Sequence, residues 1–499
     1  MLHIEARDYS SYKYVDESNP DLDLSFSGAS PPCPIKNHLF HGDKYVDEQI
    51  IHCSPYRTMN IPGILVLNKT YGSIKPGKPL YKFIPDCRYL PVFLVPYELK
   101  ATFSKAHKNK FAIIKFKEWS QEHPVGTLQE TIGDVDTLEA FCEYQLHRRG
   151  LYVSMSAFNA HVKTALKNEQ ECIATIQQRY QLPLVGEGET IFSIDPATSL
   201  DYDDAFSVKQ TGINTYRITV YIANVYLWLT TFDLFKYMTD RVSTIYLPDK
   251  KRPMLPLLLS DNYCSLKAGA KRVVYTYSQE FDIDTRQPIN EPVFGQGIAT
   301  IAKNWSYEDP KLETADGYAV LKQLSGKTDS HDVVAHWMIQ MNVACAIKGV
   351  AVYRGTEPIV PSTAKYSLQP LEHRALEVQK YTHITSPIRR LVDIMNQGPL
   401  PNWLNRLDYI NDQCKQIKRA QMDCDLLAFS MNAEPDAEYE GTIIKQLDYM
   451  EYVVQLCKYG LRVRLKCDKI LEIGFNYMFK IFVFNDENTL CKKVRLCLS

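Results

Sequence analysis

The sequence predicts an α+β protein of three or four domains, with small β-barrels on either side of a mixed central domain. Its 499 residues are ample for that number, since domains usually contain roughly 100 to 200 residues. Short β-rich runs separated by turn residues lie toward both ends, whereas strand-like and apolar helical segments alternate in the middle. Hydrophobic residues make up 45% and charged residues 23%, which is typical of globular proteins and excludes a disordered or fibrous chain.

The charge balance is close to even, with 57 Lys and Arg against 58 Asp and Glu. This excludes a uniformly basic protein that coats nucleic acid, so an anionic partner must meet a local basic surface. The 13 cysteines are scattered and have no C-x-x-C spacing, which indicates reduced thiols rather than a zinc site. The acidic N-terminal segment and the short apolar runs predict no secretion signal and no membrane partner. We therefore expect a cytoplasmic protein, with nuclear and organellar locations left open.

The first 155 residues contain two regions of different composition. Residues 1–40 are rich in Ser, Pro, Asp and Tyr and lack periodicity, which predicts a mobile arm. Residues 41–155 contain β-rich runs with turn signals between them, which predict one or two small β-barrels. Lysines alternate there with aromatic residues, as in proteins that bind single-stranded nucleic acid. Composition alone favours a simpler explanation, a solvated lysine face over an aromatic core.

The remaining chain divides into a mixed region, 156–433, and a β-rich region, 434–499. Helical spacing predicts helices over 156–181, 331–350 and 409–431, and apolar alternation predicts strands over 190–195, 205–210 and 216–223. After residue 434, five short strands carry Lys and Arg at alternate positions. This pattern predicts a small OB-type barrel at the C-terminal end.

Four carboxylates gather in the segment SIDPATSLDYDDAFSV, between two predicted strands. They are Asp195, Asp201, Asp203 and Asp204. The segment holds no Lys or Arg, and Pro196 ends the first strand, so a tight loop returns the acids toward the same strand end. Such an oxygen-rich pocket suits Mg²⁺ or Mn²⁺. The alternatives are a solvated acidic loop and a calcium-binding EF-hand, and the second lacks its required glycine and terminal glutamate.

A second signal lies in YTHITSPIRRLVDIMNQ, residues 381–397. Ser386 suits a helix N-cap and Pro387 the first helical position, which places two arginines in the first turn. Cations oppose the helix dipole there, so an anion is expected. Asp393 lies four positions after Arg389 and could hold its guanidinium, and a surface Arg-Asp pair is the alternative. The candidate phosphate-binding side chains are Thr385, Ser386, Arg389 and Arg390.

Together, these two segments resemble the RNB family of ribonucleases, which includes RNase II, RNase R and exosome-type enzymes. IDPATSLDYDDA is similar to the family's Ile-Asp-Pro and Asp-x-Asp-Asp-Ala signature, and YTHITSPIRR to its second signature. Between them, residues 244–272 resemble its Tyr-Leu-Pro, Pro-Met-Leu-Pro and Cys-Ser-Leu elements. The resemblance implies an RNB catalytic domain at 156–433, with cold-shock-like OB barrels before it and an S-one-like OB barrel after it.

The resemblance also implies an activity, namely Mg²⁺-dependent 3′ to 5′ hydrolysis of single-stranded RNA to nucleoside 5′-monophosphates. All four aspartates would hold Mg²⁺, or Mn²⁺, and no other cofactor is expected. Asp203, Asp204 and Arg389 would carry the catalysis, with Arg389 gripping the scissile phosphate. Tyr246 would stack on a terminal base and Arg390 would contact the RNA backbone. A monomer is expected, with oligomers left open.

The chain departs from the family pattern outside the predicted metal ligands. Asn224 replaces a carboxylate, Ala335 and His336 replace a Glu-Glu pair, and Gln421 replaces a glutamate. These changes predict altered affinity, product length or rate. An alternative function is an RNA-binding regulator that keeps the fold and has lost turnover, but the presence of all four aspartates favours the enzyme. A phosphodiesterase acting on DNA or small nucleotides is disfavoured by the predicted barrels.

Overall fold

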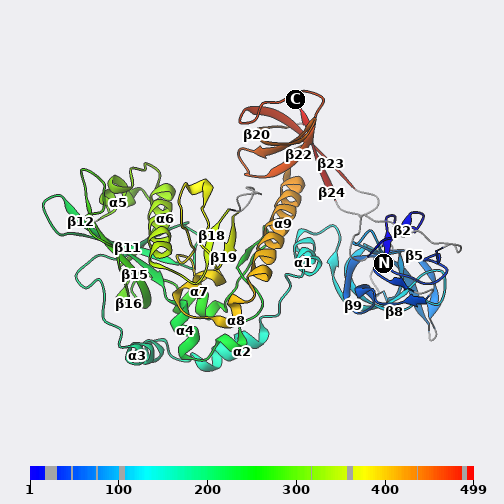
Figure 1. Ribbon diagram of the computed structural model, residues 1–499, viewed down its shortest axis with the longest axis horizontal. Helices are drawn as coiled ribbons and strands as arrows, with labels where there is room; N and C mark the ends of the chain where they lie inside the picture. Colours follow the sequence, from blue (N-terminus) through cyan, green and yellow to red (C-terminus); the bar gives the residue numbers. More distant parts are fainter. Residues whose placement is uncertain are drawn as a thin grey trace. The chain divides into compact units, whose positions relative to one another are not determined.

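The computed structural model describes residues 1–16, 31–46, 49–74, 77–99, 107–315, 317–356, 364–434, 437–485 and 492–499. These residues form two compact units (Figure 1). The flanking unit contains both ends of the chain, Met1–Tyr152 and Lys418–Ser499, with the short segment Leu247–Lys250. The central unit contains Val153–Tyr246 and Lys251–Ile417. The boundaries of the four regions expected from the sequence stay predictions.

Five strands of the flanking unit close into a barrel before residue 135. They are β5 (Asn60–Ile74), β6 (Lys78–Pro85), β7 (Phe93–Pro96), β8 (Lys110–Glu118) and β9 (Val125–Asp134). They are hydrogen-bonded in the order β5-β6-β7-β9-β8, so β9 lies between β7 and β8. The pairing of β8 with β5 closes the barrel. Apolar side chains at alternate positions, such as Phe83 and Val95, fill the interior. This is the OB-type arrangement predicted for the region. Helix α1 (Leu138–Arg148) follows the barrel.

The N-terminal residues also belong to this folded core. Strand β1 (Leu2–Ile4) pairs with β2 (Tyr12–Tyr14), and Leu2 and Ile4 are completely buried. Phe40 is buried in the same cluster, and β3 (Lys44–Val46) pairs with β4 (Gln49–Ile51). The prediction of a mobile arm over residues 1–40 is therefore wrong for 1–16 and 31–40, and 17–30 lie outside the described residues. Strands of three residues are too short to stand out in a Ser-, Pro- and Asp-rich composition.

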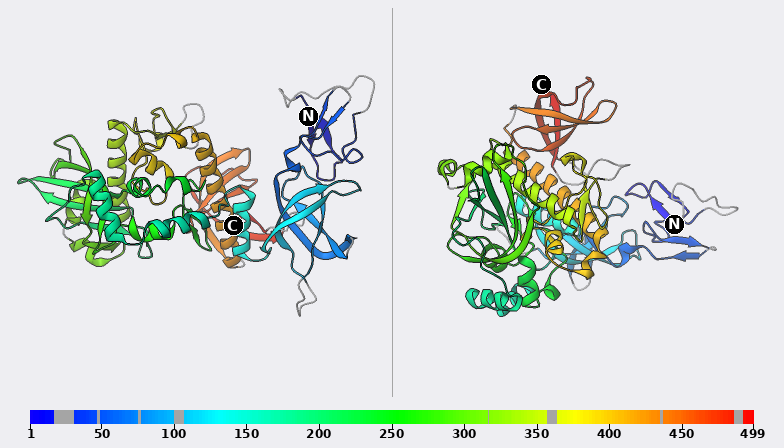
Figure 2. Two further views of the ribbon diagram at one scale, coloured as in Figure 1. Left: turned by 90° about the horizontal axis from the view of Figure 1, so that it is seen from below. Right: turned by 60° about the vertical axis from the view of Figure 1, so that its left-hand side comes forward.

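A second five-stranded sheet ends the chain. Its strands are β20 (Glu438–Asp448), β21 (Glu451–Leu456), β22 (Arg462–Lys466), β23 (Asn476–Asn485) and β24 (Lys492–Leu498). They follow the order β22-β21-β20-β23-β24, and the end strands β22 and β24 contact each other, so the sheet curls into a barrel (orange and red in Figure 2). Alternate inward residues such as Ile443, Val454 and Phe479 form its core. The predicted C-terminal OB-type barrel is confirmed.

The central unit is built on a six-stranded sheet of order β16-β15-β12-β11-β10-β17. The strands are β10 (Phe192–Asp195), β11 (Asp204–Gln210), β12 (Thr215–Ala223), β15 (Lys271–Asp282), β16 (Val293–Thr300) and β17 (Lys303–Ser306). All pairs are antiparallel except β10 with β17. Helices α5 (Tyr318–Ser325) and α6 (Ser330–Lys348) pack their apolar side chains, among them Trp337, against Phe206 and Val220 on one face. The α+β prediction is confirmed.

Shorter elements complete the central unit. They are β13 (Ile245–Tyr246), β14 (Lys251–Arg252), β18 (Tyr353–Gly355), β19 (Lys365–Ser367), α4 (Val225–Thr231), α7 (Leu391–Gln397), α8 (Pro401–Leu404) and α9 (Leu407–Asn432), which extends into the flanking unit. The single helix predicted over 156–181 is instead two, α2 (Ser156–Ala165) and α3 (Glu169–Tyr180). The side chain of Asn168 accepts a hydrogen bond from the Glu171 amide and so caps α3. No described helix is long and apolar enough to cross a membrane.

Candidate active site

The four predicted acidic residues meet at one end of the central sheet. Asp195 is the last residue of β10 and Asp204 the first of β11, and these two strands pair with each other. The loop between them carries Asp201 and Asp203. Two neighbouring strands with a short return therefore bring all four carboxylates into one region, as the sequence predicted.

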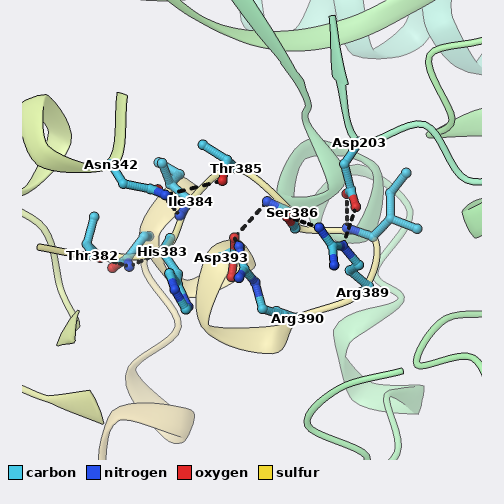
Figure 3. A network of polar contacts seen from close by, with 12 residues as sticks. Asp203, Asn342, Thr382, His383, Ile384, Thr385, Ser386, Arg389, Arg390 and Asp393 are labelled. Atoms are coloured by element: carbon cyan, nitrogen blue, oxygen red, sulfur yellow. Dashed lines mark hydrogen bonds and ion pairs between the residues drawn. The ribbon is translucent and has the colours of Figure 1, made fainter. Parts of the chain in front are cut away.

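Asp203 is fixed by the arginine segment (Figure 3). Its Oδ1 accepts a hydrogen bond from the Ile388 amide at 2.9 Å, and its Oδ2 accepts one from Arg389 Nε at 3.2 Å. Burial raises the pKa of Asp203 to about 7, and the Arg389 guanidinium opposes this shift. The contact joins the two sequence motifs through a carboxylate that is only 4% exposed.

Asp195 and Asp204 differ from Asp203 because each has a buried oxygen, Oδ2, that makes no hydrogen bond within the described part of the chain. Burial raises the pKa of Asp195 to about 6. The pKa of Asp204 lies well above its usual value, mainly because of burial and then because of the charges of Asp195 and Asp203. A buried, ionised carboxylate oxygen without a partner destabilises the folded protein unless a cation binds it. Carboxylate oxygens are also the ligands that Mg²⁺ and Mn²⁺ prefer. These two side chains therefore fit a divalent ion.

The other two acids are already paired with basic groups. Asp201 Oδ1 lies 3.1 Å from Lys251 Nζ, as Asp203 lies against Arg389. Among the described residues, no three His, Cys, Asp or Glu side chains are arranged to surround one metal ion. The prediction that all four aspartates are metal ligands thus stays a prediction, and the geometry distinguishes the pair Asp195 and Asp204 from the others.

Asp204→Asn is expected to stabilise the metal-free protein at neutral pH. Because folding raises the pKa values of these acids, the folded protein binds more protons than the unfolded chain above about pH 4. Its free energy of unfolding then falls as the pH rises. Thermal unfolding in EDTA should show a higher Tm for the variant at pH 7.5. Each kcal/mol added to the free energy of unfolding raises the Tm by about 2–4 °C. The difference should shrink as the pH falls, because the raised pKa of Asp204 favours its protonated form in the folded protein. A difference that does not change with pH contradicts this explanation.

The arginine segment has a local structure that differs from the predicted helix start. Helix α7 begins at Leu391, and the amides of Arg389 and Arg390 close a separate turn on the Ser386 carbonyl, at 3.2 and 3.0 Å. Arg390 is extended, with φ −138° and ψ 126°, and bridges to Ser243. The prediction that the two arginines lie in the first turn of a helix is therefore wrong. Tertiary contacts cause the difference, because the Ile388 amide donates a hydrogen bond to Asp203 and the Ser386 amide donates one to Asp393.

Asp393 holds Arg390 rather than Arg389. Its Oδ1 accepts hydrogen bonds from Arg390 Nη2 at 2.8 Å and from the Ser386 amide at 2.7 Å (Figure 3). The Asp393 carboxylate is the main factor raising the pKa of Arg390 against the effect of burial. The prediction that Asp393 positions Arg389 is wrong, since Asp203 does so. The role of Arg390 toward RNA stays a prediction.

Arg390→Ala is expected to destabilise the fold by about 3 kcal/mol, because it leaves the fully buried Asp393 carboxylate without its cation. Urea unfolding of the metal-free protein measures this loss. The matched variant Arg406→Ala, which breaks the more exposed pair with Asp240, should cost less than about 1 kcal/mol. Equal losses in the two variants would argue against a structural role for Arg390.

The hydroxyls predicted to bind phosphate are buried and engaged within the protein. Thr385 Oγ1 accepts a hydrogen bond from Asn342 Nδ2 at 3.3 Å, and Ser386 Oγ accepts one from Arg389 Nη2 at 3.0 Å. Both residues are less than 5% exposed. They brace the segment from within, so their predicted contact with phosphate finds no direct support in this geometry.

Two tyrosines lie beside the carboxylates. Tyr246, on β13, is 44% exposed, and burial and the nearby charge of Asp201 raise its pKa to about 12. Tyr307 was not identified from the sequence. Its amide donates to the Asp195 carbonyl at 3.1 Å, and its ring stacks on His331 with centroids 3.6 Å apart. The available signal was an aromatic residue directly after β17, the parallel neighbour of β10.

The Cys-Ser-Leu element supports the acidic loop. The buried Ser265 hydroxyl donates to the Leu200 carbonyl at 2.9 Å and accepts from the Tyr202 amide at 3.0 Å. The Leu266 amide donates to the Tyr202 carbonyl. Asn224, one of the departures from the family pattern, caps α4 by accepting a hydrogen bond from the Leu227 amide at 3.2 Å. Asn224, at the position where the family pattern has a carboxylate, therefore acts as the N-cap of α4.

Comparison with known proteins identifies the central domain. The family model described as "RNB domain" matches residues 187–315 and 359–406, which include all four aspartates and both arginines. The chain is 28% identical over 265 residues to "DIS3-like exonuclease 2" of Schizosaccharomyces pombe, covering 50% of this chain and 28% of that protein. Residues 187–315 and 359–406 are therefore similar to the RNB domain. The chain spans well under half the length of the curated relatives that it matches first.

Solved structures agree with this fold. The "Mycoplasma genitalium RNase R in complex with ribose methylated single-stranded RNA" superposes with a TM-score of 0.70 at 15% identity, covering 92% of this chain and 95% of that one. The "Structure of yeast Ssd1, a pseudonuclease" superposes with a TM-score of 0.58 at 14% identity, covering 86% of this chain and 67% of that one. At these identities the structures show the fold alone, an RNB domain with flanking OB-type barrels.

Proposed function

We propose that the chain is a divalent-metal-dependent 3′ to 5′ exoribonuclease that hydrolyses single-stranded RNA to nucleoside 5′-monophosphates. The observation that carries the proposal is the pair Asp195 and Asp204, whose buried oxygens lack partners beside an arginine held on Asp203. Oxygen ligands for a cation and a guanidinium for a phosphate are the two components of metal-assisted phosphodiester hydrolysis. The match of residues 187–315 and 359–406 to the RNB domain supports the same reaction class.

In this mechanism Asp195 and Asp204 would hold Mg²⁺, with Mn²⁺ as an alternative. A bound divalent ion supplies an activated water and charge neutralisation at the phosphate. Asp203 orients Arg389 through Nε, and Ser386 restrains Nη2. The side chain of Arg389 is 46% exposed, so its guanidinium can reach a phosphate and stabilise the charge that develops there. Preorganisation by Asp203 removes part of the cost of fixing a flexible arginine.

Single-stranded RNA is the proposed substrate because an RNase R of this fold is described in complex with it. Stacking of bases on Tyr246 is tolerant of sequence, so most RNA sequences should be degraded. A cytoplasmic location and a monomeric state, both expected from the sequence, belong to the same proposal.

A second function is favoured by one observation, the similarity of the fold to the pseudonuclease Ssd1 of yeast. In that case the chain binds RNA without cleaving it. The four aspartates and Arg389 are all present, and Asp195 and Asp204 each keep one buried oxygen that makes no hydrogen bond to the described residues, which favours the enzyme.

A degradation time course on a 5′-labelled single-stranded RNA tests the proposal, with Mg²⁺ or with EDTA and beside a DNA of the same sequence. We expect metal-dependent shortening of the RNA to a short 5′ fragment, with the DNA intact. RNA binding without cleavage in Mg²⁺ and Mn²⁺ would instead support the pseudonuclease. Cleavage that persists in EDTA would contradict the metal-dependent mechanism.

Tyr246→Ala is expected to lengthen the limit product by removing one stacking partner for the terminal bases. A stacked base contributes about 1 to 3 kcal/mol, which corresponds to a roughly 5- to 150-fold weaker hold on the last nucleotides. The products are resolved on a sequencing gel. Tyr246→Phe keeps the ring and should give the wild-type product length. If the alanine variant gives that length as well, Tyr246 is not part of the RNA site.

A further inference from the structure

Lys251 is a basic residue at the acidic cluster that the proposed mechanism does not use. It lies on β14, directly opposite Tyr246 on β13. Directly paired residues of antiparallel strands project to the same face, so Lys251 shares the side of the hairpin with the proposed stacking tyrosine. Its Nζ lies 3.1 Å from Asp201 Oδ1 and 3.4 Å from Asp261 Oδ1. The ammonium thus bridges two carboxylates.

The bridge is partly shielded from solvent. The side chain of Lys251 is 28% exposed, and those of Asp201 and Asp261 are 16% and 15% exposed. The Ser260 hydroxyl donates to the same Asp261 oxygen at 2.7 Å, which fixes that carboxylate. Screening by water is therefore weaker than for a surface pair, and the ammonium has a defined position.

The lysine makes the charge distribution of the cluster uneven. Asp201 shares the Lys251 ammonium with Asp261, and Asp203 is paired with Arg389. Asp195 and Asp204 each keep a buried oxygen that makes no hydrogen bond to the described residues. A two-metal site requires carboxylates that serve ions about 3.5–4 Å apart. An ammonium within hydrogen-bond distance of Asp201 repels a second divalent ion at that carboxylate and occupies the oxygen that such an ion would need.

We infer that Lys251 serves as a fixed cation in place of a second divalent ion at Asp201, so that the chain binds one such ion, through Asp195 and Asp204. Lys251 is a positioning residue, because it acts through Asp201 and holds the acidic loop in place. The inference rests on the proposed metal-dependent function and specifies the number of ions that it uses.

Counting bound Mn²⁺ tests the inference without measuring activity. The full-length protein is titrated with Mn²⁺ alone, and free Mn²⁺ is followed by its electron paramagnetic resonance signal. We expect about one bound ion per chain for the wild type and about two for Lys251→Met, because Asp201 and Asp261 then face each other without a cation. Lys251→Arg restores a fixed cation and should return the count to one. The control Lys267→Met removes a nearby lysine that contacts the Asn262 amide, and should leave one.

Each outcome decides the question. A wild-type protein that binds two ions overturns the inference and leaves the proposed function intact, and this holds even if Lys251→Met fails to fold. A folded Lys251→Met variant that binds one ion also overturns it. A wild-type protein that binds no Mn²⁺ overturns both the inference and the metal-dependent function. A second ion in both lysine-to-methionine variants would assign the effect to net charge, and the inference would again be wrong.

Discussion

Asp204→Asn is expected to abolish RNA hydrolysis while RNA binding persists. Asn keeps the volume of the side chain and removes the charge, so the divalent ion would lose one of the two ligands whose buried Oδ2 makes no hydrogen bond to the described residues. Changes that only surround metal ligands already cost about 10- to 100-fold, so loss of the ligand itself should reduce the rate by more than about 100-fold. Single-turnover degradation of labelled RNA in saturating Mg²⁺ measures the loss.

The matched control is Asp233→Asn, which changes an exposed aspartate of the same unit. It should degrade RNA at the wild-type rate. An unchanged circular dichroism spectrum and an unchanged affinity for RNA in EDTA would confirm that Asp204→Asn is folded. If this variant hydrolyses RNA at a near-native rate, the metal site assigned to Asp195 and Asp204 is wrong.

Arg389→Ala is expected to lower kcat on the order of 10³-fold, the lower range for an arginine that stabilises a phosphoryl transition state. The effect on KM should be smaller, because the proposed role of the guanidinium is to stabilise charge that develops in the transition state. The variant also removes the cation from Asp203, whose buried carboxylate then has only the Ile388 amide as a described partner for its charge. Initial rates over a range of RNA concentrations separate the two constants.

Arg389→Lys distinguishes charge from geometry. Lysine keeps the positive charge but lacks the planar guanidinium, which can donate to Asp203 and to a phosphate at the same time. The kcat should therefore stay well below the wild-type value. Recovery of the full rate by lysine would show that Arg389 acts only as a charge. Wild-type kcat in the alanine variant would remove Arg389 from the reaction.

The sheet and the acidic cluster could be predicted because their information is local. Alternating apolar residues marked β10, β11 and β12, and Pro196 after Asp195 marked the turn that returns the chain. The C-terminal barrel was likewise visible in the alternation along its strands. In each case the pattern that sets the fold lies within a few residues of the feature it predicts.

The partners of the acids could not be predicted, because they come from distant segments. Lys251 is 50 residues from Asp201 and reaches it only through the β13-β14 pairing. The segment around Ser386 was misread for the same reason. Its residues favour a helix N-terminus locally, but Asp203 and Asp393 bind its amides and hold a turn instead. Tertiary hydrogen bonds outweigh a capping preference of about 1 kcal/mol.

The hydrogen bonds that Ile388 and Arg389 donate to Asp203 have a consequence for synthesis of the chain. They join residues 185 and 186 positions apart, so the acidic loop is made long before its arginine. A chain interrupted anywhere between them carries every proposed metal ligand and lacks the guanidinium. Contacts of such long range also form late in folding. Under the proposed function, RNA hydrolysis therefore requires that the arginine segment has been made and has docked on Asp203.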